Sequence, residues 1–258
     1  MESKPPVSVF ILSRNEEQRI GPALESVSWA AEIVLIDSFS TDRTPEIAAK
    51  HGARVVQIEF RKFGELRQAG IEHTTQPWVF SLDSDERCTP EARDEILRIV
   101  ADPGSADAYL VPRQNYLLGR RIRHGGWYPD YRQPQLFRRG RMRYAVEDDV
   151  HEGWELDGRL GRMANPIVQI PYRTLAEAIG KMNRYTSLGV ARQERIGASS
   201  SYAKALLRAK WAFFKSYVLQ LGFLDGGPGL VIALLRFENS FYKHAKLVEH
   251  RLPPAGRD

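Results

Sequence analysis

Apolar and polar residues are arranged in blocks along the first hundred residues, and the blocks have the lengths of strands and helices. Short apolar runs rich in β-branched residues cover residues 7–12, 33–36, 55–58 and 78–82. Such runs are typical of strands buried on both faces of a parallel sheet. Segments with a helical period cover residues 16–29, 44–52 and 89–100. The alternation predicts an α/β fold with a mostly parallel sheet flanked by helices.

The pattern becomes less regular after residue 108. Residues 108–112 predict one more strand, and an arginine-rich and aromatic stretch follows over 113–144. From residue 175 to 250 the period is helical again, with large apolar residues between lysines and arginines. We therefore expect a domain over 1–170, divided after residue 100, and a basic amphipathic helical extension over 171–258.

Charge is unevenly distributed along the 258 residues. The net charge is +5, but residues 171–258 contain 14 Lys and Arg against 6 Asp and Glu, whereas residues 1–170 contain 23 against 26. A balance of +8 in the tail against −3 before it predicts a docking surface for an anionic partner. Nucleic acid, a phosphorylated sugar and an anionic membrane all fit this charge.

Cysteine usage and the length of the apolar runs indicate the cellular compartment. The single cysteine, Cys88, excludes an internal disulfide and favours a reducing compartment. The apolar run near the N-terminus has six residues, too few for the core of a signal peptide. A longer stretch over 211–235 is interrupted by Lys215 and Asp225, so no transmembrane helix is expected. We expect a cytoplasmic protein, peripheral at the inner face of the cytoplasmic membrane.

Polar residues follow three of the predicted strands, where ligands of an open parallel sheet bind. The three stretches are residues 13–16, 37–40 and 83–86. In the last of them Asp83 and Asp85 form an Asp-x-Asp pair, and two such carboxylates can share one Mg²⁺ or Mn²⁺ while diphosphate oxygens complete its coordination. A G-x-G-x-x-G after the first strand and a P-loop motif are both missing, which disfavours a dehydrogenase and a P-loop NTPase.

Three linked segments carry a resemblance to a known family: VSVFILSRNEE, EIVLIDSFSTDRT and FGELRQAGIEHTTQPWVFSLDSDE. In this order and spacing, over residues 5–100, the chain resembles the nucleotide-sugar half of the family 2 glycosyltransferases, which have the GT-A fold. The resemblance implies a nucleotide-diphosphate-sugar donor, a divalent metal and inversion at the anomeric carbon. It makes residues 1–100 the donor-binding half and 101–170 the acceptor-binding half.

The resemblance also implies site residues. Asp37 would bind the base, Arg67 would help to hold the donor, and Ser13, Asn15 and Glu16 would line the nucleotide pocket. Asp83 would contact ribose and metal, and Asp85 would ligate the metal and take part in catalysis. Two features depart from the family pattern: the usual proline after the first strand is absent, and the second strand ends in Asp-Ser-Phe-Ser.

Inverting transfer also needs a base that accepts the proton of the acceptor hydroxyl. The acidic segment over 146–154, VEDDVHEGW, offers the candidates. Its Val-His-Glu resembles a subgroup related to lipopolysaccharide core glucosyltransferases that act on heptose. We expect Glu152 to be the base, with Asp149 and Asp148 as alternatives. His151 is a candidate third metal ligand, with an acceptor contact or a structural hydrogen bond as the other readings.

Arginines are concentrated over residues 120–143. They are Arg120, Arg121, Arg123, Arg132, Arg138, Arg139, Arg141 and Arg143, opposed there by Asp130 alone and interleaved with Trp127, Tyr128 and Tyr131. Arginine forks bind phosphate and aromatic rings stack on sugars, so the stretch favours a phosphorylated saccharide, although it also fits single-stranded nucleic acid. The predicted helices over 202–221 and 230–248 are typical of interfacial amphipathic helices, or of helices packed on a core.

These observations favour a metal-dependent, inverting glycosyltransferase. We expect it to move a hexose, glucose from UDP-glucose being the first choice, onto a lipopolysaccharide core or another anionic lipid-linked saccharide at a membrane surface. One alternative within the class is transfer to a polyprenyl phosphate or an exopolysaccharide intermediate. An alternative from a different class is a non-catalytic RNA- or glycan-binding protein. The clustered carboxylates disfavour this last reading, and we expect no nucleic-acid partner.

Overall fold

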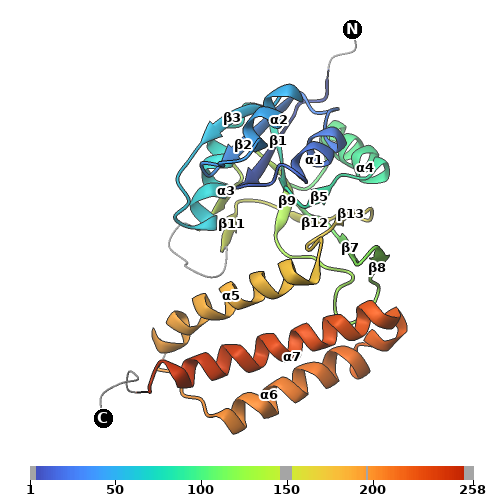
Figure 1. Ribbon diagram of the computed structural model, residues 1–258. Helices are drawn as coiled ribbons and strands as arrows, with labels where there is room; N and C mark the ends of the chain where they lie inside the picture. Colours follow the sequence, from blue (N-terminus) through green and yellow to red (C-terminus); the bar gives the residue numbers. More distant parts are fainter. Residues whose placement is uncertain (1–3, 146–152, 196, 253–258) are drawn as a thin grey trace. The chain divides into compact units, whose positions relative to one another are not determined.

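A computed structural model describes residues 4–145, 153–195 and 197–252 (Figure 1). The chain divides into two compact units. The first runs to Gln114 and resumes over Asp130–Gln169, and the second contains Asn115–Pro129 and the residues from Ile170 onward. The later change of unit, after Gln169, falls one residue before the boundary expected after residue 170. The earlier segment, which we expected in the acceptor-binding half, groups instead with the helical tail.

The first unit is built on a mostly parallel sheet. Among the described residues, its strands follow the order β12-β6-β9-β4-β1-β2-β3. β9 is antiparallel to both β4 and β6, whereas β12–β6, β4–β1, β1–β2 and β2–β3 pair in parallel. The bounds are β1 Val7–Ser13, β2 Glu32–Asp37, β3 Arg54–Gln57, β4 Trp78–Asp83, β6 Ala108–Leu110, β9 Pro134–Arg138 and β12 Leu160–Arg162. The predicted parallel α/β fold is confirmed.

Alternation along the central strand divides the core into two layers. The odd positions of β1, such as Val9 and Ile11, pack with the helices α1 Ile20–Ser26, α2 Thr44–Lys50 and α4 Pro90–Ala101. The even position Phe10 lies on the other face with α3, Phe63–Glu72. A Cβ on Gly70 would come within 2.5 Å of the Phe10 ring, so α3 approaches the sheet this closely because residue 70 has no side chain.

Two helices differ from the sequence prediction. The expected helix over 16–29 is shorter, Ile20–Ser26, because Asn15 adopts a left-handed backbone and residues up to Arg19 form turns. The helix α3 has no counterpart among the predicted elements. Its buried face contains two glycines and Arg67, so it lacks the regular apolar period on which the prediction relied.

Shorter strands occur outside the main sheet. They are β5 Glu86–Arg87, β7 Arg113–Leu117, β8 Arg120–Arg121, β10 Met142–Tyr144, β11 Trp154–Leu156 and β13 Ile167–Gln169. Within the first unit β13 pairs antiparallel with β5, placing Gln169 opposite Glu86, and β10 pairs antiparallel with β11. The pairing of β5 and β13 holds the segment directly after Asp85 in place.

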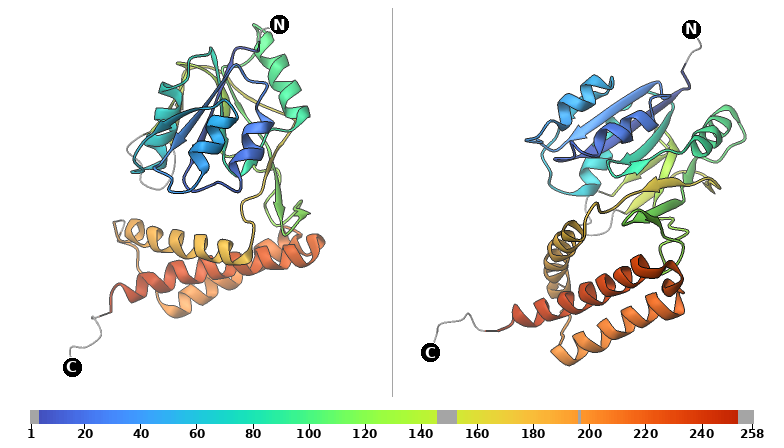
Figure 2. Two further views of the ribbon diagram at one scale, coloured as in Figure 1. Left: turned by 45° about the horizontal axis from the view of Figure 1, so that its top comes forward. Right: turned by 45° about the vertical axis from the view of Figure 1, so that its right-hand side comes forward.

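The second unit is helical, as the tail predicted. α5 Leu175–Arg195 and α6 Tyr202–Phe214 both lie against α7 Gly226–Glu249 (Figures 1 and 2). A π-helical turn, Lys215–Leu219, and a 3₁₀ turn, Gly222–Asp225, connect α6 to α7. Ile122 and Leu117 from the inserted segment pack on Ile232 of α7. This apolar cluster explains why the inserted segment belongs to the helical unit.

Hydropathy of the described helices bears on membrane spanning. Taken alone, each helix in the described part of the chain is too short or too polar to cross a bilayer. The stretches Tyr202–Leu219 and Gly222–Glu249 satisfy the length and composition requirements only as a pair, and they are bent by 69° relative to each other.

Candidate functional site

The strand ends that carry the predicted site residues are neighbours at one edge of the sheet. Ser13 at the end of β1 lies opposite Asp37 at the end of β2, and Leu12 lies opposite Asp83 at the end of β4. The register therefore brings the three predicted polar segments together, as their positions after parallel strands implied. The roles assigned to the individual residues remain predictions.

Asp37 and Asn15 lock the loops after β1 and β2 to each other. The Asp37 carboxylate is fully buried and accepts hydrogen bonds from the Ser40 amide, at 2.9 Å, and the Ser40 hydroxyl, at 2.5 Å. The Asn15 backbone amide donates to the same hydroxyl, and the Asn15 side-chain oxygen Oδ1 accepts from the Thr41 backbone amide, both at 2.8 Å. Asp37 and Asn15 thus fix the conformation of the loops that follow β1 and β2.

Glu16 anchors the start of the loop before α1. Its backbone amide donates to the Thr44 hydroxyl at 2.8 Å, and its carboxylate lies 3.4 Å from Arg19. Ser13 is buried at the end of β1. Both residues are therefore at the predicted nucleotide edge, held by contacts within the first unit.

Arg67 holds Asp83 at the end of β4. One guanidinium nitrogen donates to both carboxylate oxygens, at 2.9 and 3.2 Å, and another donates to the Ser81 hydroxyl at 3.0 Å. Burial favours the neutral acid, but the charges of Arg67 and Arg113 outweigh it and lower the pKa of Asp83. Arg67 is 5% exposed, so the structure assigns it first to the positioning and ionisation of Asp83.

Glu86 holds the backbone of the acidic turn from inside the core, and the sequence analysis did not single it out. Its carboxylate is fully buried and accepts hydrogen bonds from Arg113 Nε at 2.5 Å, Gln135 Nε2 at 2.9 Å and the Asp83 amide at 3.0 Å. Gln135 also donates to the Ser81 carbonyl at 3.1 Å. The backbone of the Asp-x-Asp turn is thus fixed by Glu86, which is itself held in the core by its ion pair with Arg113 and its hydrogen bond from Gln135.

Asp85 lies beside a glutamine amide that is also buried. Gln169 Nε2 is 3.4 and 3.5 Å from the two Asp85 oxygens, and Asp85 is 8% exposed. Within the described part of the chain, the Gln169 amide oxygen is buried and has no hydrogen-bond partner. An amide oxygen and two carboxylates suit Mg²⁺ or Mn²⁺, so the residues present fit the implied metal.

This fit to a metal rests on the chemical type of the oxygen ligands. No group of three His, Cys, Asp or Glu side chains that could enclose a cation is found over residues 4–145, 153–195 and 197–252. The predicted third ligand, His151, and the predicted bases Glu152, Asp149 and Asp148 lie outside the described residues.

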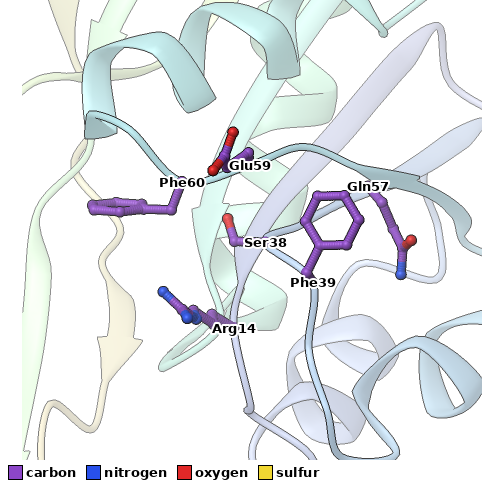
Figure 3. A pocket seen from close by; sticks show the side chains of 6 residues that line it. All are labelled: Arg14, Ser38, Phe39, Gln57, Glu59 and Phe60. Atoms are coloured by element: carbon purple, nitrogen blue, oxygen red, sulfur yellow. The ribbon is translucent and has the colours of Figure 1, made fainter.

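A pocket of about 600 Å³ opens at the ends of β1, β2 and β3 (Figure 3). Its lining residues are Arg14, Ser38, Phe39, Gln57, Glu59 and Phe60. The rings of Phe39 and Phe60 lie on either side of Ser38 in the close view, and they are 56% and 40% exposed. The sequence analysis did not single out these two rings. Large apolar side chains within three residues of the ends of β2 and β3 were the available signal.

The arginines of 120–143 are divided between the two units. Arg120, Arg121 and Arg123 belong to the helical unit, and the other five belong to the first unit. Partners beyond Asp130 correct the expectation of an almost unopposed cluster: Arg141 pairs with Asp157 at 2.6 Å, and Arg143 pairs with Glu155. The antiparallel β10–β11 pairing brings these carboxylates opposite the arginines.

Comparison with known proteins extends over most of the chain. LpsC, a lipopolysaccharide core biosynthesis glycosyltransferase of Rhizobium meliloti, is 29% identical over 262 residues and covers 95% of each chain. An uncharacterized glycosyltransferase of Rickettsia bellii is 26% identical, covering 94% of this chain and 86% of its own. The crystal structure of S. aureus TarS 1–349 matches with a TM-score of 0.51 and 16% identity over 94% of this chain and 88% of its own, which shows a shared fold.

The family model described as "Glycosyl transferase family 2" matches residues 8–153, more than half of the chain. The matched region begins in β1, contains the Asp37 loop and the Asp-x-Asp turn, and reaches the acidic segment that was expected to supply the base. The resemblance stated from the sequence is thereby confirmed, and the chain belongs to glycosyl transferase family 2 and is a glycosyltransferase.

Proposed function

We propose that this glycosyltransferase moves a hexose from a nucleotide-diphosphate sugar to a saccharide of the lipopolysaccharide core, with inversion at the anomeric carbon. The observation that carries the proposal is the convergence of Asp37, Asp83 and the two-phenylalanine pocket at one sheet edge. The 29% identity with LpsC over 95% of both chains supports the acceptor class. Glucose from UDP-glucose remains the first donor to test.

The pocket and the acidic turn would bind different parts of the donor. Exposed rings of Phe39 and Phe60 offer flat apolar surfaces to a base, and Arg14 between them offers a positive charge to the diphosphate. Asp83 and Asp85, with the Gln169 side chain beside Asp85, would hold a divalent cation that neutralises the charge of the leaving diphosphate. Because the pKa of Asp83 is lowered, this carboxylate is ionised at neutral pH, as a metal ligand must be.

The transfer itself needs a base on the acceptor side. In the proposed step, a carboxylate accepts the proton of the acceptor hydroxyl while that oxygen attacks the anomeric carbon and the bond to the diphosphate breaks. The products are an inverted glycoside and a nucleotide diphosphate. Glu152 is the proposed base and Asp149 the alternative.

A donor and acceptor screen tests this function. The full chain is incubated with single nucleotide sugars and Mn²⁺ or Mg²⁺, and nucleotide diphosphate release is measured with core-truncated lipopolysaccharide, with polyprenyl phosphate and without acceptor. We expect release from one donor to be stimulated by the truncated lipopolysaccharide and to be lost in the Asp85→Asn variant. Stimulation by polyprenyl phosphate alone would favour the alternative acceptor and refute the lipopolysaccharide proposal.

A further inference from the structure

The helix α6 is packed with its small residues inward. Ala205 and Ala209 are fully buried and Ser216 in the following turn is 1% exposed. At 3.6 residues per turn, these positions and Ala212 form one stripe along the helix. The stripe belongs to the helix that lies along α7 (Figures 1 and 2). The helical unit is therefore held together at this contact by alanines and a serine.

The large apolar residues of α6 point the other way. Leu207 is 68% exposed, Trp211 58% and Phe214 45%, and their spacing places them opposite the alanine stripe. A helix on the surface of a protein in water has the reverse arrangement, with its large apolar residues inward. Small residues between helices and large residues outside are the arrangement of helices that contact lipid.

The turn after α6 extends this surface. Between residues 218 and 224, the exposed apolar side chains are Val218, Leu219, Leu221, Phe223 and Leu224. The charged residue that follows, Asp225, is 3% exposed and accepts hydrogen bonds from the backbone amides of Arg123 and His124, at 3.1 and 2.8 Å. The turn thus presents apolar side chains outward and keeps its carboxylate inside the unit.

Basic side chains flank the apolar face. Lys204, Arg208 and Lys215 are exposed, and the helical period places them together along one side of the large apolar residues. In this structure Lys204 Nζ donates to the Ser199 carbonyl at 3.1 Å, and Arg208 Nη1 lies 3.3 Å from His244 Nε2. At a membrane, such side chains extend their apolar stems along the surface and place their charges among anionic headgroups. The same flank would oppose a second copy of the chain, because antiparallel pairing through this face brings like charges together.

We propose that α6 and residues 218–224, here called the insertion turn, enter the boundary between headgroups and acyl chains of an anionic bilayer leaflet. This inference deepens the proposed transfer to a lipid-linked saccharide by naming the surface that meets the membrane. Binding to protein-free vesicles requires neither donor nor acceptor, so it can succeed or fail independently of the glycosyl transfer.

A fluorescent probe in the insertion turn tests the proposal with the full chain. Leu219→Cys is labelled with an environment-sensitive dye, which is selective because burial raises the pKa of the Cys88 thiol to about 12. Leu160→Cys, at an exposed position of the first unit, is the matched control. On vesicles of phosphatidylcholine with phosphatidylglycerol, we expect a blue shift and quenching by brominated lipid at position 219 and neither at position 160.

Apolar-to-polar variants measure how much the turn contributes. Because Leu219 is 56% exposed, about half of its side chain is available to lipid, and Leu219→Gln should weaken vesicle binding by roughly tenfold. Leu160→Gln should leave it unchanged. Salt-sensitive binding without any change at the 219 probe would mean electrostatic adsorption alone and would overturn insertion. A lipid-free dimer that is abolished by Leu219→Gln would identify a second copy as the occupant and would also overturn it.

Discussion

Replacing Glu86 by glutamine should destabilise the first unit although the two side chains have almost the same shape. Glu86 is fully buried, and Arg113 beside it is 1% exposed, so the variant leaves a guanidinium in the core without its closest counter-charge. In the wild type, three hydrogen-bond donors, from Arg113, Gln135 and the Asp83 backbone, share the Glu86 carboxylate. In the variant the same three donors face an amide group, which is itself a donor at one end. Each of these changes opposes folding.

The expected loss can be worked from this geometry. Removing one member of a buried ion pair costs roughly 3–5 kcal/mol of unfolding free energy. Asp83 and Asp130 also contribute to the raised pKa of Arg113 and so partly compensate for the loss of Glu86. We therefore expect about 3 kcal/mol, the lower end of that range. The exposed pair of Arg143 and Glu155 supplies the matched control, since Glu155→Gln should cost less than about 1 kcal/mol.

Urea unfolding followed by circular dichroism measures both variants, with the midpoint shift converted through a common slope. An Arg113→Met background isolates the pair. In that background Glu86→Gln should cost roughly 2 kcal/mol less than in the wild type, because the cation that it would leave uncompensated is gone. Equal losses for Glu86→Gln and Glu155→Gln, or strict additivity with Arg113→Met, would refute the assignment of the buried pair.

Three further expectations concern the site. Asp85→Asn should lower transfer by several orders of magnitude without unfolding the chain, and EDTA should do so reversibly, whereas full activity in EDTA contradicts the proposed metal dependence. Glu152→Gln should lower the transfer rate roughly 10²–10⁴-fold with donor binding unchanged in calorimetry, and an inactive Asp149→Asn beside an active Glu152→Gln would move the base. The lowered pKa of Asp83 means that its stabilisation is present above pH 3.8 and is lost as pH falls through the folded value. Arg67→Met should reduce that acid-side loss, because Arg113 still lowers the pKa of Asp83, and urea midpoints measured against pH would show it.

The parallel sheet was predictable because each central strand is apolar on both faces. Residues 7–12 carry no polar side chain except Ser8, and this apolar run is visible without knowing which strands lie beside it. α3 was not predictable in the same way. Its inward face carries Gly70, which fits against Phe10, and Arg67, which pairs with Asp83, so the periodic signal is replaced by contacts with residues distant in the sequence.

The same distinction applies to the site. The position of Asp37 and Asp83 at one edge was predictable because each directly follows an apolar run, and the register of parallel strands then brings them together. Glu86 immediately follows the Asp-x-Asp pair but reads as one more acid in a polar turn. Its burial depends on Arg113, 27 residues later, and on Gln135, 49 residues later. A local pattern cannot contain such a partner, because the charge is tolerated in the core only after the fold has brought the arginine to it.

In the helical tail the amphipathic pattern was visible in the sequence, but the sequence did not show which face of the helix is buried. An amphipathic period in residues 202–219 is compatible with either face turned inward. Burying Ala209 in place of Leu207 forgoes roughly 1–3 kcal/mol of apolar stabilisation in water, the difference between a methyl group and a leucine side chain. Ala205 and Ser216 are likewise small residues that are buried while large apolar residues stay exposed. The missing apolar stabilisation is recovered only where the outer face of the helix contacts lipid or another apolar surface. The inverted packing of α6, more than the charge of the tail, is therefore the feature that favours insertion over electrostatic adsorption.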